Sequence, residues 1–336
     1  MTAIRWVAAE DASFSLNNGQ LAASVDNRGT LLYLAQLPLR HQLAWFDRFG
    51  KEQARSGLAQ DQRHVAFSPD QGRVASVRRV QGGNEIWVRD LARDIETRFA
   101  VVPATAPVWA PDGRNVAFSS RGQLHAKDTG GGEPKVLMQN GNTKNPSDWS
   151  RDGRTLVYTE TDQKTRGDIW LLLNPLSSVD KKAVPLLRTD ANESQGRISP
   201  DGRWIAYASD ESGRTEVYVR PFPSGDGRWR VSNNQGAEPS WRQDGKELFY
   251  TEAAGTRRRI VAVPISSVPG MRFEAGVPKS LFDFPTLSFT IESNLSVYGP
   301  SADGSRFLAD VQVGDSQPTL NVITNWQQLL TIAPTR

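Results

Sequence analysis

One short phrase, rich in Ser, Pro, Asp and Gly, recurs along almost the whole chain at nearly even spacing. Its seven copies occupy positions 24–29, 68–72, 110–113, 150–153, 199–202, 242–245 and 301–304. The Asp residues of these copies stand at 26, 70, 112, 152, 201, 244 and 303, so neighbouring copies are 40 to 59 residues apart. A period near 40 residues is typical of the four-stranded blades of a β-propeller. The phrase therefore predicts a ring of small, similar sheets.

Each copy has the chemistry of a tight turn between two strands. Pro presets φ at the second turn position, Asp caps the turn with its side chain, and Gly accepts a positive φ. Apolar residues alternate after the turn, as at Leu248 and Tyr250, which is the period of two that half-buried strands require. An aromatic residue stands three positions before the Asp in four copies, as Phe67, Trp109, Trp149 and Trp241. We expect these aromatic residues to pack between neighbouring sheets.

Two further strands complete each repeat. A third strand follows at 85–91, 168–174 and 216–222, and a weaker fourth strand comes after it. Seven copies with four strands each predict an all-β chain that forms a seven-bladed β-propeller of four-stranded antiparallel blades, in a single domain of residues 1–336. Six blades are the fallback, because the first copy lacks Pro and inserts Asn27 and Arg28 between Asp and Gly.

The two ends of the chain are expected to close the ring together. The last copy is followed by one more strand pattern, TLNVITNW at 319–326, which we expect to be the third strand of the last blade. Residues 3–10 precede the first copy and have no partner in sequence, so we predict that this N-terminal strand completes the last blade. Such closure would remove the open edges of the sheets.

Composition narrows the class of partner. There are 40 Lys and Arg residues and 37 Asp and Glu residues, and the net charge of +3 is too small to predict nucleic-acid binding. The N-terminus has no apolar core of a signal peptide, and no apolar run is long enough to span a membrane. We therefore expect a monomer without a membrane span, cytoplasmic as the sequence is written, or periplasmic or extracytoplasmic if it is part of a longer protein.

Catalytic motifs are missing from the sequence. It has no Cys and no GxSxG elbow, so a cysteine or serine hydrolase is not expected. The three histidines, His41, His64 and His125, fall in different repeats without metal-ligand spacing. We expect no catalytic residue, no metal and no cofactor, and we interpret the run from Arg257 to Arg259 as a solvated loop.

The segments SPDGRWIAYASDESGRTEVYVRPFP at 199–223 and EPSWRQDGKELFY at 238–250 resemble the TolB-like repeat family, also called WD40-like. More narrowly, they are similar to the propeller that follows the serine/threonine kinase domain in proteins of certain soil bacteria. The resemblance runs from about Leu21 to Trp326 and implies a β-propeller with a binding role. The sequence contains no Gly-rich nucleotide loop, HRD or DFG motif of a kinase itself.

Ligands of propellers usually meet the end of the central channel that is formed by the loops entering each innermost strand and by the loops joining the second and third strands. Topology places nine polar residues at that mouth: Asn145, Glu193, Gln195, Arg197, Glu238 and Asn294 from the entering loops, and Arg79, Arg121 and Glu211 from the others.

Three functions fit these features. The leading prediction is a non-catalytic binding or scaffold module that meets a protein, a peptide or a small ligand at the channel, as the sensor propeller of a kinase-associated protein. The first alternative is an enzyme of the propeller lyase or glycosidase type, with an acid cluster such as Glu193 and Glu238 at the channel mouth. The second alternative is a structural subunit of a TolB-like envelope complex, which would show an exposed apolar patch.

Overall fold

The computed structural model describes residues 23–25, 29–35, 40–101, 103–266, 273–286, 295–314 and 319–325. All elements assigned in these residues are β-strands, and within them no helix is long and apolar enough to cross a membrane. The chain divides into two compact units, one of residues 41–312 and one of residues 1–40 with 313–336. The assignment of residues 1–336 to one domain stays a prediction.

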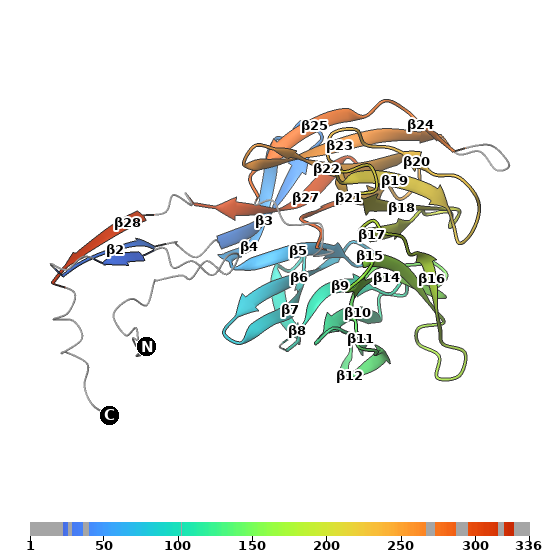
Figure 1. The fold of residues 1–336 in the computed structure, drawn as a ribbon, viewed down its shortest axis with the longest axis horizontal. Helices are drawn as coiled ribbons and strands as arrows, with labels where there is room; N and C mark the ends of the chain where they lie inside the picture. Colours follow the sequence, from blue (N-terminus) through green and yellow to red (C-terminus); the bar gives the residue numbers. More distant parts are fainter. Residues whose placement is uncertain are drawn as a thin grey trace. The chain divides into compact units, whose positions relative to one another are not determined.

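The larger unit is a β-propeller whose described residues form six blades around a common centre (Figure 1). Blade 1 contains β5 (Gln62–Phe67), β6 (Arg73–Val80), β7 (Gly83–Asp90) and β8 (Ile95–Ala100). Blade 2 contains β9 (Thr105–Trp109), β10 (Asn115–Ser120), β11 (Gln123–Asp128) and β12 (Gly131–Met138). Blade 3 contains β13 (Thr143–Trp149), β14 (Thr155–Asp162), β15 (Arg166–Leu173) and β16 (Lys182–Leu187).

The remaining blades follow the same antiparallel order. Blade 4 contains β17 (Glu193–Ile198), β18 (Trp204–Ser209), β19 (Glu216–Pro221) and β20 (Trp229–Arg230). Blade 5 contains β21 (Ala237–Trp241), β22 (Glu247–Ala254), β23 (Arg257–Ser266), β24 (Glu274–Ala275) and β25 (Lys279–Phe284), and both β24 and β25 pair with β23. Blade 6 contains β26 (Tyr298–Pro300), β27 (Arg306–Val313), β3 (Arg40–Asp47) and β4 (Glu52–Gln60).

The predicted turns are confirmed in the six copies from 68–72 onward, although in the copy at 68–72 the positive φ belongs to Gln71 and not to Gly72. Each copy joins the first and second strands of a blade. Asp70 Oδ1 accepts the backbone N–H of Gly72 at 3.0 Å, and the equivalent Asp303 Oδ1 accepts the N–H of Ser305 at 3.0 Å. The Ser301 hydroxyl also donates to Asp303, and these hydrogen bonds to the charged form lower the pKa of Asp303 to about 2.

The prediction of seven blades is wrong, and the fallback of six is correct. The first copy joins β1 (Ala23–Val25) to β2 (Thr30–Ala35), and these strands form a separate three-stranded sheet with β28 (Thr319–Thr324). β1 and β2, the strands on either side of this copy, pair antiparallel. A turn signal carries no information on which sheet its strands join, so this copy was counted as a blade.

The prediction of the closing strands is also wrong in its details. The segment 319–326 was expected as the third strand of the last blade, but β28 pairs with β2 instead. The third and fourth strands of blade 6 are β3 and β4, which lie next to β27 in the strand order β26-β27-β3-β4. The edge of β27 is therefore already occupied. Residues 3–10, predicted to complete the last blade, lie outside the described residues.

Apolar side chains of facing sheets fill the space between blades. At the boundary of blades 4 and 5, Trp204 and Val219 pack with Leu248 and Val263 in one buried cluster. Trp109 and Trp149 are buried, which confirms their assignment to packing. The Trp109 indole N–H donates to the backbone oxygen of Ala66 at 2.9 Å, so this ring also ties blade 2 to blade 1.

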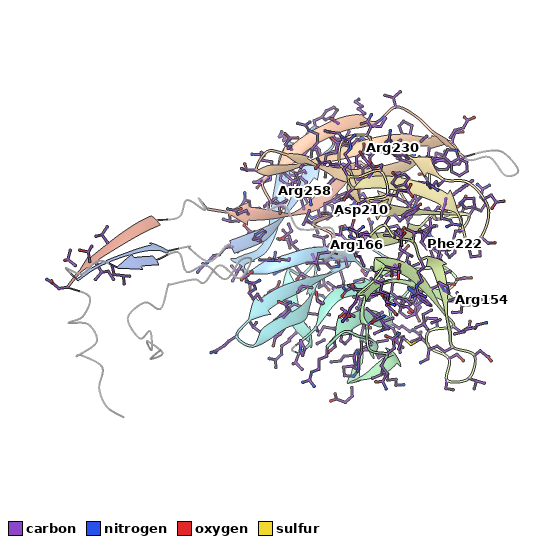
Figure 2. All side chains as sticks on the ribbon, viewed as in Figure 1. Arg154, Arg166, Asp210, Phe222, Arg230 and Arg258 are labelled. Carbon is purple, nitrogen blue, oxygen red and sulfur yellow. The ribbon has the colours of Figure 1, made fainter. Side chains whose placement is uncertain are left out.

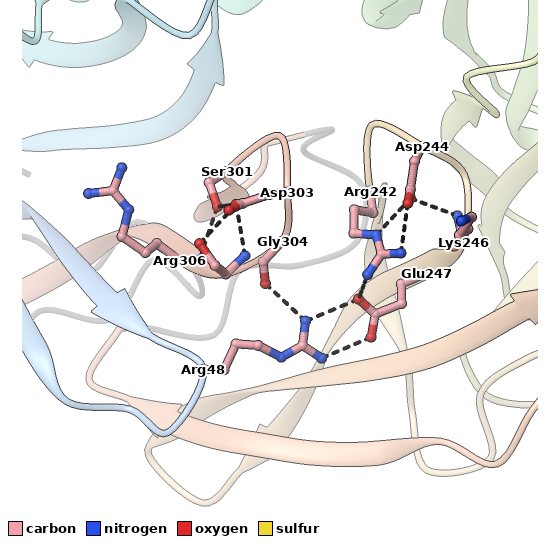
Figure 3. A network of polar contacts seen from close by, with 10 residues as sticks. Arg48, Arg242, Asp244, Lys246, Glu247, Ser301, Asp303, Gly304 and Arg306 are labelled. Carbon is pink, nitrogen blue, oxygen red and sulfur yellow. Dashed lines mark hydrogen bonds and ion pairs between the residues drawn. The ribbon is translucent and has the colours of Figure 1, made fainter.

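One arginine joins both halves of the closing blade to its neighbour (Figure 3). Arg48, just after β3, donates to Glu247 of blade 5 at 3.0 and 2.8 Å and to the Gly304 backbone oxygen of blade 6 at 2.9 Å. Arg242 donates to the same Glu247 at 2.7 Å. Arg48 comes from the N-terminal half of the blade and Gly304 from the C-terminal half. These bonds therefore stabilise the closure of the ring.

We expect Arg48→Met to lower the free energy of unfolding by about 1–2 kcal/mol, because it removes three hydrogen bonds that involve a charged group and are partly shielded from water. The matched control is Arg55→Met, whose guanidinium pairs with Glu52 on the exposed surface of the same hairpin and which should cost about 0.5 kcal/mol or less. Urea unfolding measures both. Equal losses would show that Arg48 has no special role in closure.

Candidate functional site

The innermost strands share an irregularity at one fixed position. Six residues before each turn Asp of the ring stand His64, Ala106, Pro146, Gln195, Glu238 and Val297. The pairing register shifts beside this position in blades 1 to 5. Non-glycine residues have positive φ at four of the six positions, with values of 76° at His64, 51° at Ala106, 58° at Gln195 and 56° at Glu238. Such bulges re-aim side chains, and strained backbone of this kind is frequent at binding sites.

Side chains at this position connect the first strands of neighbouring blades. His64 Nδ1 of blade 1 accepts the N–H of Ser296, which precedes β26 of blade 6, at 2.8 Å. His64 Nε2 lies 3.1 Å from the Pro107 backbone oxygen of blade 2. One imidazole therefore links three blades, and we call His64, Gln195 and Glu238 the inner collar.

The other half of the inner collar runs from blade 4 to blade 6. Gln195 Oε1 accepts the N–H of Glu238 at 2.7 Å. Glu238 Oε2 then accepts the N–H of Val297 at 3.0 Å, and the Tyr298 hydroxyl donates to the Glu238 backbone oxygen at 3.0 Å. Burial raises the pKa of Glu238, while Arg258, at 3.3 Å, favours its charged form.

The hydrogen bonds of His64 define its protonation state. Because Nδ1 accepts a backbone N–H, the proton of the neutral ring is on Nε2, which donates to Pro107. Protonation of Nδ1 would break the first bond and place a charge among buried groups. Burial accordingly lowers the pKa of His64 to about 3.

A cavity of about 550 Å³ lies beside the inner collar and reaches the repeated turns. Its walls include the four aromatic residues predicted before the turns, Phe67, Trp109, Trp149 and Trp241, and Pro residues of three turns. A volume of this size is within the range of small-ligand and peptide pockets. The aromatic spacing was visible in the sequence, but the ligand-binding mouth was predicted at the opposite end of the inner strands.

Two opposite charges line the inner part of this cavity. Asp148 Oδ2 accepts the N–H of Ile198 at 2.7 Å, and burial raises the pKa of this carboxyl although Arg197 opposes the shift. Arg197 donates to the backbone oxygen of Ser147. At the rim, Arg151 of blade 3 donates to the Gln243 backbone oxygen of blade 5 at 2.9 Å. The cavity thus combines aromatic walls with a few convergent polar groups.

The structure separates the nine residues predicted at the channel mouth. Gln195 and Glu238 belong to the inner collar, and Arg197 is the one of the nine that lines the described cavity. Arg79 and Arg121 are on or after second strands, with Arg79 4.0 Å from Asp61 and Arg121 at a φ of 50° in the β10–β11 turn. The remaining three described residues are Asn145 in β13, Glu193 in β17 and Glu211 after β18. Asn294 lies outside the described residues.

Glu193 and Asp168 form a buried acid pair at the end of the ring opposite the turns. Each is 1% exposed. Thr189 donates to Glu193, and Thr165 donates to Asp168 at 2.6 Å. Burial raises the pKa of Glu193 to about 7, and the neighbouring charge of Asp168 adds to the shift. Glu238, which was expected beside Glu193, interacts instead with Arg258 and Val297.

Ion pairs cover the surface around this acid pair. Arg166, the first residue of β15, donates to Asp210, after β18, at 2.7 Å and so connects blades 3 and 4 (Figure 2). Glu211 accepts from Arg228 at 2.7 Å. Within the described ranges, no group of three or more His, Asp or Glu side chains is arranged to hold a metal ion.

Comparisons with known proteins identify the fold. No family model matches this chain. It is similar to a protein assigned as TolB from Agrobacterium tumefaciens, with a TM-score of 0.64 and 17% identity over 82% of this chain and 99% of that chain. TolB from Acinetobacter baumannii has a TM-score of 0.54 and 16% identity over 82% of this chain and 64% of that chain, so this chain spans just under two thirds of its length.

A third similar structure is an oligogalacturonate lyase in complex with manganese, with a TM-score of 0.53 and 13% identity over 87% of this chain and 83% of that chain. At these identities the comparisons show the fold alone. The fold is a TolB-like β-propeller, as the sequence resemblance implied. The relationship to kinase-associated propellers stays a prediction.

We expect the neutral collar histidine to make stability dependent on pH. The pKa of His64 is about 3 in the folded chain and about 6.5 in the unfolded chain. Between these values the unfolded state binds one more proton, so stability falls as pH decreases from about 6.5, by up to about 1.4 kcal/mol per pH unit. This component should be absent in His64→Gln and present in the control His125→Gln. Identical pH profiles for the two variants, measured by urea unfolding, would contradict the assignment.

Glu193 should have the opposite pH effect. Its pKa of about 7 lies above the ordinary value of 4.5, so its contribution to stability is lost as pH rises from about 4.5 through 7. Between pH 5 and pH 8, we expect Glu193→Gln to gain about 2 kcal/mol relative to the wild type. Glu133→Gln, at an exposed position of β12, is the control and should show no such gain. Melting temperatures at the two pH values measure the difference.

Proposed function

We propose that this chain is a non-catalytic binding module that takes a protein, a peptide or a small ligand into the central cavity at the turn face. The observation that carries the proposal is the cavity of about 550 Å³ between the inner collar and the repeated turns. Its aromatic and Pro walls offer apolar contact area, and Asp148, Arg197 and Arg151 offer polar groups of both signs. The hydrogen-bonded collar keeps these walls in place before a ligand arrives, which lowers the entropic cost of binding.

The similarity to TolB structures supports a binding role. Within this role we propose that the propeller acts as a monomeric sensor or scaffold in a kinase-associated protein, on the basis of the repeat sequences at 199–223 and 238–250. The alternative of a structural subunit in an envelope complex would use the same fold with a larger protein partner.

A selection with peptides tests the proposal. Peptides selected from a random displayed library on the wild-type protein would be labelled and their affinity measured by fluorescence anisotropy. Ser240 lines the cavity, and Ser240→Phe fills part of its volume. We expect this variant to bind the selected peptides at least tenfold more weakly, while Ser212→Phe, at an exposed turn position, should leave their affinity unchanged.

Equal affinities of the two variants would show that the cavity is not the binding site. To test whether the cavity binds a small ligand, the binding of a set of metabolites to both variants would be measured in parallel. Loss of binding in Ser240→Phe alone, with an unchanged melting temperature, supports it.

One observation favours the enzyme alternative: the buried acid pair Glu193 and Asp168, with a pKa of about 7 at Glu193. A carboxyl that titrates near neutral pH suits general acid–base catalysis. Incubation of the protein with oligogalacturonate and Mn²⁺ tests this alternative by the ultraviolet absorbance of an unsaturated product. Turnover that is lost in Glu193→Gln would overturn the non-catalytic proposal.

A further inference from the structure

A second hollow, of about 460 Å³, lies outside the central cavity between blades 1 and 2. One wall is the hairpin of β7 and β8, and the other is the hairpin of β11 and β12. We call this hollow the blade 1–2 groove. None of the eight described residues among those predicted for the channel mouth lines it.

Cations outnumber carboxylates in the blade 1–2 groove. Four cationic side chains line it: Arg73, Arg93, Arg98 and Lys127. Arg93 is 77% exposed and 4.0 Å from Asp90, and Arg98 is 58% exposed and 3.5 Å from Glu85. Ion pairs this long and this exposed contribute little, so both guanidinium groups are available to an incoming anion.

The two carboxylates in the lining are engaged by their own turns. Asp90 Oδ1 accepts the backbone N–H groups of Ala92 and Arg93, both at 3.0 Å. Asp128 Oδ1 accepts the N–H of Gly130 at 2.6 Å. These bonds hold the two carboxylates against the backbone of their own turns, and four cations against two carboxylates leave the lining of the groove with a net positive charge.

Apolar groups lie beside the cations. Ile95, on the outer strand β8, is 58% exposed, and Val88 and Phe99 line the groove with it. On the facing wall a Cβ at Gly131 would meet no atom within 4 Å, so that side of the groove is open. A surface that joins exposed guanidinium groups to an apolar floor fits a peptide better than a bare anion, because it contacts acidic and apolar side chains together.

We propose that the blade 1–2 groove binds an acidic peptide segment of a partner protein. Carboxylates of the peptide pair with Arg93, Arg98 and Lys127, and an apolar side chain between them packs on Ile95 and Phe99. This site is separate from the central cavity, so the propeller contacts its partners at two places.

The probe is a fluorescein-labelled hexapeptide of alternating Asp and Leu, compared with its Asn and Leu counterpart by fluorescence anisotropy at low and at physiological salt. We expect the wild type to bind the acidic peptide at least tenfold more tightly than the neutral one, with affinity falling as salt rises. Arg93→Glu with Arg98→Glu should reduce the affinity at least tenfold. Both side chains are exposed, and Arg93→Gln with Arg98→Gln serves as the milder second variant.

The matched control is Arg257→Glu with Lys279→Glu, which makes the same change in net charge at exposed positions of blade 5. This control should keep the acidic peptide's affinity within about twofold. An equal loss in both double variants would mean attraction by net charge alone and would overturn the proposal. It would also be overturned if the neutral peptide bound equally well, or if inorganic phosphate or a short oligonucleotide displaced the peptide at lower concentration than an unlabelled acidic peptide.

Discussion

The pairing of β27 with β3 is the constraint on which the rest of the propeller depends. Blades 1 to 5 are each continuous in sequence, but blade 6 takes two strands from each end of the ring. Without this pairing the ring would present two open sheet edges and an exposed apolar boundary on either side. The buried contact of His41 in β3 with Asp310 in β27, at 3.2 Å, and the bonds of Arg48 add side-chain contacts to the backbone ladder at this one junction.

The closed ring in turn sets the geometry of the centre. Six first strands converge there, and the position six residues before the turn Asp brings His64, Gln195 and Glu238 into contact with the backbone of neighbouring blades. Burial raises the pKa of Glu238 and lowers that of His64, because both titratable groups are buried where they connect neighbouring blades. The result is a central cavity with aromatic walls that are positioned by the blades and not by flexible loops.

Local chemistry in the sequence predicted a large part of this architecture. In the turns at 68–72 and 301–304 the Ser hydroxyl donates to the Asp two residues later, so these turns could be predicted without knowledge of the fold. The blade count and the closing strands depend on pairings between distant segments. The repeated phrase does not mark β3, and the partner strand β27 comes from the far end of the chain. The pairing of these two strands therefore could not be predicted from the spacing of the phrase.

The candidate site was also predicted only in part, because its contacts join residues of different blades. Gln195 and Glu238 were predicted as polar residues of the loops that enter the inner strands, but they lie on β17 and β21. Their burial depends on backbone groups of neighbouring blades that a single repeat does not contain. The acid pair of Glu193 and Asp168 could not be predicted for the same reason, because the two residues belong to different blades. By contrast, the fixed distance from the collar position to the turn Asp was present in the sequence and could have indicated the collar.

The shared closing blade also sets the order in which the molecule can be assembled during synthesis. About 260 residues separate the end of β3 from the start of β27, and at about 5–20 residues per second a ribosome needs on the order of 10 to 50 seconds to make them. Blades 1 to 5 can pair within themselves as they emerge, whereas β3 and β4 have only each other as partners during that time. The first strands of the ring to be made are thus among the last to be fully paired, and the hairpin of β3 and β4 is the segment most in need of protection from other chains in the cell.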